Sequence, residues 1–131
     1  MIECMVLGDS IAVGYQQHRT ECVVYAKVGL NSWEWNKTYK PDGMMAETVI
    51  ISLGVNDHEY VRTERELRTL RDKVYAKRVY WIMPSTNSVA QALVKRIASE
   101  RKDMIITTNK LASDNIHPSP AGYKELVEKS R

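Results

Sequence analysis

The chain has 131 residues, of which 44% are apolar and 27% charged, as expected for one globular domain. Nineteen basic residues against 16 acidic ones give a net charge of +3, which is too small to require nucleic acid or an anionic membrane as a partner. No apolar run approaches the roughly 20 residues that cross a bilayer, and the first residues read as a strand instead of a signal peptide. We therefore expect a single domain over residues 1–131, cytoplasmic unless a larger particle carries it out.

Five short apolar runs rich in β-branched residues recur along the chain and are typical of strands. They are nearly continuous in hydrophobicity, as in a parallel sheet that is covered on both faces. Helix-compatible segments separate them. The pattern predicts a three-layer α/β/α sandwich with a five-stranded, mostly parallel sheet in the flavodoxin-like order 2-1-3-4-5. The predicted strands are residues 2–7, 22–26, 48–53, 78–83 and 104–107.

Four segments carry helix signals: residues 11–17, 63–77 and 88–101, and a last helix that begins at Ser119 and Pro120. The helix over residues 63–77 also carries a stripe of arginines, which either grips an anionic substrate or is a solvated helix face. The stripe comprises Arg62, Arg65 and Arg68.

The least regular segment, residues 31–47, contains Trp33, Trp35 and Tyr39. Its tryptophans either stack on a sugar or acyl chain or cover one end of the sheet, and the second role is the more usual one for aromatic side chains. Cys4 and Cys22 lie in apolar runs without metal-ligand spacing. This favours two buried free thiols over a metal site or a disulfide.

Polar residues and glycines follow four of the five predicted strands, at residues 8–10, 27–31, 54–57 and 114–118. The carboxyl ends of parallel strands share one edge of the sheet, where open α/β sheets bind ligands. These stretches would bring a hydroxyl, a glycine amide, a carboxamide and an Asp/His pair to one crevice.

That set of groups is suited to nucleophilic catalysis. The Ser10 hydroxyl needs a base, and His117 is suited to take its proton near neutral pH. Asp114, three residues earlier, can hold the imidazole in the correct tautomer. The Ser10 and Gly29 backbone N–H groups and the Asn56 side chain are the predicted oxyanion-hole donors. Taken singly, each residue also has an ordinary explanation as a helix cap or a turn.

Together, the four stretches resemble the SGNH hydrolases, also called GDSL-type esterases and lipases. The matches are Gly8-Asp9-Ser10, the glycine Gly29, Gly54-Val55-Asn56-Asp57 and Asp114-Asn115-Ile116-His117, in the family's order. The resemblance implies the three-layer sandwich, catalytic Ser10, Asp114 and His117, an oxyanion hole of Ser10, Gly29 and Asn56, and neither a metal nor an organic cofactor.

The chain is shorter than many SGNH hydrolases, so its cleft is expected to be open and suited to a short acyl group such as an acetyl on a sugar. Asp9 and Asp57 are expected to hold loops by hydrogen bonds. Candidate residues at the pocket rim are His58, Tyr60, Trp33 and Asn87.

The leading hypothesis is an esterase or deacylase that forms an acyl-Ser10 intermediate on a small-molecule or carbohydrate ester. Two alternatives stay open: acyl transfer to an alcohol through the same residues, and a non-catalytic carbohydrate-binding or assembly module on the same fold. A flavodoxin-like nucleotide binder would need a phosphate loop, and residues 8–14 lack the required glycine spacing.

Overall fold

The computed structural model describes residues 1–131, in which five strands and five helices alternate. All neighbouring strands pair in parallel in the order β2-β1-β3-β4-β5, which confirms the predicted fold class and strand order. The strands are β1 (Cys4–Gly8), β2 (Val23–Ala26), β3 (Met44–Ser52), β4 (Val74–Ile82) and β5 (Met104–Ile106). The helices are α1 (Ser10–Gln17), α2 (Ser32–Tyr39), α3 (Thr63–Asp72), α4 (Ser88–Arg101) and α5 (Pro120–Lys129).

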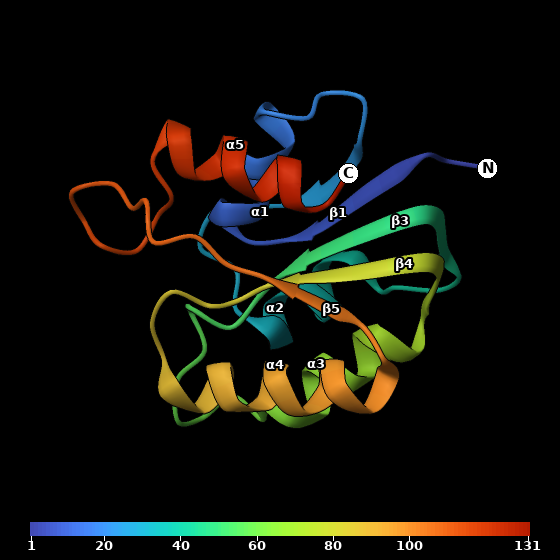
Figure 1. Ribbon diagram of the computed structural model, residues 1–131. Coiled ribbons are helices and arrows are strands. Elements are labelled where there is room, and N and C mark those ends of the chain that lie inside the picture. The colour runs from blue at the N-terminus through green and yellow to red at the C-terminus, as the bar shows by residue number, and fades with distance from the viewer.

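The sheet is covered on both faces, with α1 and α5 on one side and α2, α3 and α4 on the other (Figure 1). Each strand contributes side chains to the hydrophobic core on both faces of the sheet, because successive side chains point to opposite faces. In β1, Val6 belongs to the core beneath α1 and α5, whereas Leu7 belongs to the core on the opposite side. β1 is therefore apolar and buried along its whole length, as the continuous run in the sequence predicts.

The predicted helix over residues 63–77 is wrong in its last part, because α3 ends at Asp72 and β4 begins at Val74. Val74 fits a helical spacing, but it pairs with Met44 at the start of β3. The Met44 N–H also donates to the Lys73 carbonyl at 2.8 Å. Sheet pairing thus overrides a local pattern that suits either structure.

The prediction of an irregular segment over residues 31–47 is also wrong, because this stretch contains α2 and the start of β3. A capping box begins α2: Asn31 Oδ1 accepts from the Glu34 N–H at 2.8 Å, and Glu34 Oε1 accepts from the Asn31 N–H at 3.1 Å. The Asn-x-x-Glu spacing was the signal for this helix. Its two tryptophans have different environments, since Trp35 is fully buried and Trp33 is 46% exposed.

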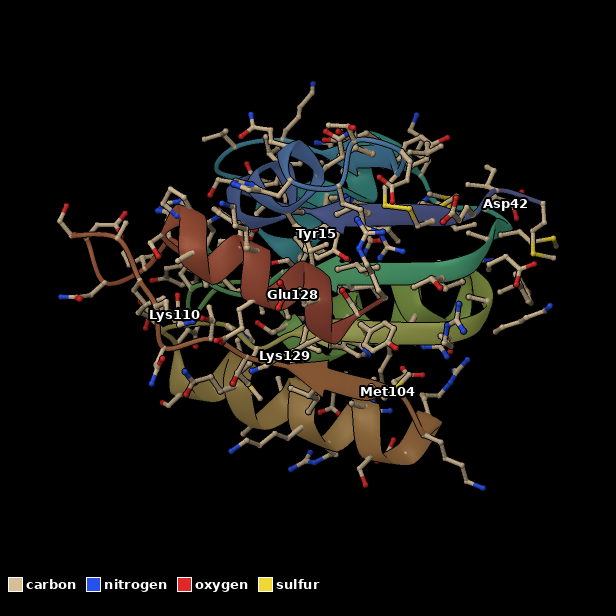
Figure 2. The ribbon with its side chains drawn as sticks, turned by 45° about the horizontal axis from the view of Figure 1, so that its top comes forward. Tyr15, Asp42, Met104, Lys110, Glu128 and Lys129 are labelled. Atoms are coloured by element: carbon tan, nitrogen blue, oxygen red, sulfur yellow. A yellow bond between two sulfur atoms is a disulfide. The ribbon has the colours of Figure 1, made fainter.

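The expectation of free thiols is wrong, because Cys4 and Cys22 form a disulfide with their Cα atoms 4.7 Å apart. Figure 2 shows this sulfur–sulfur bond in yellow. The pairing of Met5 with Val23 places the two cysteines opposite each other at the start of β1 and β2. Spacing along the chain does not show this proximity. Disulfides persist chiefly in oxidising compartments, which weighs against the cytoplasmic expectation.

The disulfide closes a loop that contains α1, and we expect it to contribute about 3 kcal/mol to the free energy of unfolding. Addition of a reductant should lower the urea midpoint of the wild-type protein. The double variant Cys4→Ala/Cys22→Ala should start from a lower midpoint and show no response to the reductant. A wild-type midpoint that does not move on reduction would contradict the stabilising role.

Candidate active site

The turn after β1 is held tightly against the end of β3. Gly8 pairs with Ser52, and the next N–H, that of Asp9, donates to the Ser52 carbonyl at 3.1 Å. Gly8 has φ = +148°, and a Cβ atom here would lie 1.9 Å from the Ser52 oxygen. Only glycine fits this position. The close turn starts α1 immediately, so Ser10 lies at the carboxyl edge of the sheet.

Three side chains form a continuous chain of hydrogen bonds at this edge. Ser10 Oγ lies 2.7 Å from His117 Nε2, although 107 residues separate them in sequence. His117 Nδ1 lies 2.6 Å from Asp114 Oδ2. With the ring proton on Nδ1 facing the carboxylate, Nε2 is free to accept the serine proton. The structure thus brings together the three predicted catalytic residues.

Asp114 is kept ionised by its own turn. Its second oxygen, Oδ1, accepts from the backbone N–H groups of Ile116 and His117 at 2.9 and 3.0 Å. The Ile116 bond, followed by the bonds to the His117 side chain and backbone, lowers the pKa of Asp114 to about 2. The carboxylate is therefore a negatively charged partner for the imidazole throughout the neutral range.

The segment between β5 and α5 carries both Asp114 and His117 and runs along the carboxyl ends of the strands (Figure 1). The Ala112 N–H closes the turn by donating to the His117 carbonyl at 2.7 Å. The Ser85 hydroxyl, which follows β4, donates to the Ile116 carbonyl at 2.6 Å. The Ser85 bond ties the turn to the segment that follows β4, next to the residue that contacts Ser10.

The three predicted oxyanion donors follow the neighbouring strands β1, β2 and β3. Neither the Ser10 nor the Gly29 N–H donates a hydrogen bond within the protein. Gly29 has φ = +85°, is exposed, and has nothing within 4 Å of the position of a Cβ atom. Asn56 Nδ2 donates to the Leu30 carbonyl at 3.0 Å, which leaves its second hydrogen available.

Two other polar residues of the predicted site hold loops. Asp57 accepts from the Ser32 N–H at 2.8 Å and from the Ser32 hydroxyl at 2.6 Å, which ties the segment after β3 to the start of α2. Asn87 Nδ2 donates to the carbonyls of Gly54 and Asp57 at 2.9 and 3.0 Å. Asn87 therefore supports the loop that carries Asn56.

Asp9 caps the helix that begins with Ser10. Its Oδ1 accepts from the Ile11 N–H at 3.0 Å and from the Ser52 hydroxyl at 3.4 Å, as its expected loop-holding role requires. The residue is fully buried, and its other oxygen, Oδ2, has no partner. Burial raises the pKa of Asp9 to about 7, and the hydrogen bonds to Oδ1 only partly offset this effect.

Two cavities flank the loop over residues 55–62. One, of about 430 Å³, is lined by Trp33, Tyr60 and His58, and the other, of about 400 Å³, by Asn87 and again His58. Each of the four residues predicted at the pocket rim lines one of these two cavities, and neither Ser10 nor His117 lines either of them. No group of three or more His, Cys, Asp or Glu side chains is arranged to hold a metal ion, and no helix is long and apolar enough to span a bilayer.

The structure is thus a parallel α/β/α sandwich with a hydrogen-bonded Ser-His-Asp set at the carboxyl edge of its sheet. No family model and no curated protein sequence matches the chain. A crystal structure of a GDSL-like lipase from Bacteroides thetaiotaomicron VPI-5482 is similar, with a TM-score of 0.69 and 13% identity over 98% of this chain and 86% of that one. A "putative acylhydrolase" from Bacteroides fragilis NCTC 9343 has a TM-score of 0.64 and 11% identity over 98% and 85%. These likenesses confirm the expected three-layer α/β/α fold.

The buried Asp9 carboxyl should make stability fall as the pH rises from about 4 to about 7. In this range the unfolded chain, with a pKa of 3.8, has lost the proton that the folded protein retains. The expected slope is roughly 1.4 kcal/mol per pH unit, which urea unfolding at pH 5 and pH 7 can measure. Asp9→Asn should remove most of this slope, while Asp42→Asn, at an exposed carboxyl, should retain it. Equal slopes in the two variants would contradict the assignment.

Proposed function

We propose that the protein is a serine hydrolase that cleaves a short-chain carboxylic ester, with a sugar O-acetyl group as the favoured substrate class. The observation that carries the proposal is the Ser10–His117–Asp114 chain, with contacts of 2.7 and 2.6 Å. A non-catalytic binding module on this fold has no physical need for these three side chains in hydrogen-bonding order. The fold of the similar structures supports the same class of reaction.

In the first half of the reaction, Ser10 Oγ attacks the ester carbonyl carbon while His117 Nε2 takes the serine proton. The Asp114 carboxylate stabilises the imidazolium that forms. The tetrahedral intermediate then expels the alcohol, which receives the proton from His117, and the acyl group remains on Ser10. In the second half, a water molecule attacks the carbonyl carbon of the acyl group while His117 Nε2 takes its proton. The bond to Ser10 Oγ then breaks, Oγ receives that proton from His117, and the carboxylic acid is released.

Negative charge on the carbonyl oxygen needs donors that are already in place. The Ser10 N–H at the start of α1 and the exposed Gly29 N–H are both free of protein acceptors. Asn56 supplies its second amide hydrogen, while its bond to Leu30 fixes the orientation of the carboxamide. The dipole of α1 adds to the field at the same point.

The surroundings of the site favour a small acyl group. A cavity of about 80 Å³ is lined by Ile11 and Ile116, which are the sequence neighbours of Ser10 and His117. In this proposal the acyl group enters this cavity, which holds about as much as two or three water molecules in the liquid and so admits only a short chain. The His117 side chain is 40% exposed, which leaves access for a large alcohol such as a sugar. The same residues would transfer the acyl group to a second alcohol if one displaced water.

A fluorophosphonate probe should label the protein at Ser10, because it reacts with serines that an adjacent base activates. Mass spectrometry of the labelled peptide should place the adduct on Ser10, and Ser10→Ala and His117→Ala should abolish it. Ser119→Ala, at another helix-capping serine, is the control and should label like the wild type. A folded wild-type protein that remains unlabelled would contradict the enzyme and favour a binding module.

Replacement of the Asn56 carboxamide should lower kcat more than it changes KM, since an oxyanion donor acts mainly in the transition state. For a short-chain p-nitrophenyl ester we expect Asn56→Ala to lose about 10² to 10³ in kcat. Asn56→Asp, of nearly the same shape but without the N–H donor, should lose at least as much. Unchanged turnover in a folded Asn56→Ala protein would remove this residue from the oxyanion hole.

A further inference from the structure

The cavity of about 430 Å³ lies next to the segments that carry two oxyanion candidates. Asn31, which lines it, follows Gly29 by two residues, and His58 follows Asn56 by two residues. The bond from Asn56 to the Leu30 carbonyl joins these segments at 3.0 Å. A ligand in the cavity would therefore lie beside the segments that carry Gly29 and Asn56. The volume is in the range of about 300 to 1,000 Å³ that is usual for small-molecule sites.

Two exposed aromatic side chains line this cavity. Trp33 is 46% exposed and Tyr60 is 85% exposed, whereas Trp35, two residues along α2, is fully buried. Trp35 thus belongs to the hydrophobic core, whereas Trp33 lies at the surface. Exposed aromatic side chains offer a flat apolar face with a polar tip, which suits the partly apolar, partly hydroxylated surface of a sugar ring.

The same cavity contains an unpaired guanidinium. Within the arginine stripe, Arg68 pairs with Glu64 and Glu100, and Arg65 with Glu66. Arg62 makes no ion pair and no side-chain hydrogen bond, in contrast to every other arginine of the chain. Arg65 also lines the cavity, but its charge is paired with Glu66, whereas Arg62 has no ion-pair partner and remains available to an anion.

The other charges around the cavity leave it positive. Glu34 is its one carboxylate, and it accepts from the Asn31 N–H in the capping box of α2. The Lys37 ammonium lies 4.8 Å from the centroid of the Trp33 ring and adds a second cation nearby. The cavity on the other side of the loop instead contains Asp57 and Glu59 and no Lys or Arg. An anionic ligand would thus favour the cavity that contains Arg62.

We propose that this cavity binds a carboxylate-bearing sugar, such as a uronic acid, whose O-acetyl group is presented to Ser10. Arg62 takes the carboxylate through its planar pair of donors, and Trp33 and Tyr60 contact the ring. The proposal rests on the proposed esterase function and adds to it the class of alcohol that the enzyme deacetylates. Acetate and the free sugar are the products, and water is the co-reactant.

Two substrates that differ only at C6 test the charge preference: mono-O-acetylated methyl galacturonoside and the corresponding acetylated methyl galactoside. The wild-type enzyme should have a kcat/KM at least about tenfold higher on the acid, as expected for one charge-assisted contact. Arg62→Ala should reduce this ratio to about one. Arg131→Ala removes the same charge at the far end of the chain and should keep the wild-type ratio. A wild-type ratio near one, or a ratio that Arg62→Ala does not change, would overturn the proposal.

A binding measurement separates this proposal from the esterase proposal. Ser10→Ala protein would be titrated with unacetylated methyl galacturonoside and methyl galactoside while the indole N–H signal of Trp33 is followed by NMR. The acid alone should shift this signal at millimolar concentration, and the shift should be lost in Ser10→Ala/Arg62→Ala. Equal shifts with both sugars, or none with either, would refute the sugar site. If the wild type cleaves no p-nitrophenyl acetate, the esterase proposal fails and this titration still decides the site.

Discussion

The parallel register of β1 between β2 and β3 is the constraint on which the site depends. It aligns Gly8 with Ala26 and with Ser52, so the segments that follow all three strands leave the sheet at one level. Ser10, Gly29 and Asn56 are then brought to the same edge by backbone pairing instead of by contacts with each other. A shift of one residue in either pair would exchange the side chains that β1 presents to the two cores, so Val6 and Leu7 would each lose their packing partners.

Both ends of β1 are held to a neighbouring strand. The Cys4–Cys22 disulfide joins β1 to β2 where the strands begin, and the close turn at Gly8 joins β1 to β3 where they end. At that second end the buried Asp9 carboxyl caps α1 and leaves one oxygen unpaired. A buried polar atom without a partner destabilises the fold. This destabilising group directly precedes Ser10 in the turn that positions the serine hydroxyl.

The sequence predicts the sheet and the site better than it predicts the boundaries of elements. Strand ends and polar motifs depend on local patterns, so Ser10, Asp114 and His117 could be placed at one edge before any contact was known. Val74 and the disulfide depend instead on which segments become neighbours. Periodicity does not reveal that a valine at helical spacing pairs with Met44, nor that Cys4 lies opposite Cys22. Only α2 carried an overlooked local signal, the capping box at Asn31.

The candidate site separates the chemistry from recognition of the substrate. Asp114 and His117 share a turn whose own amides bind the carboxylate, so the pair needs no burial to maintain its geometry. This allows the imidazole to lie partly exposed at an open edge. Side chains that could distinguish one alcohol from another then lie outside the chain of proton transfer, on α2 and on the loop between Asn56 and α3. In the proposed enzyme, substitutions there would change which ester is bound while leaving the hydrogen bonds of Ser10 in place, and Arg62 is the clearest such position.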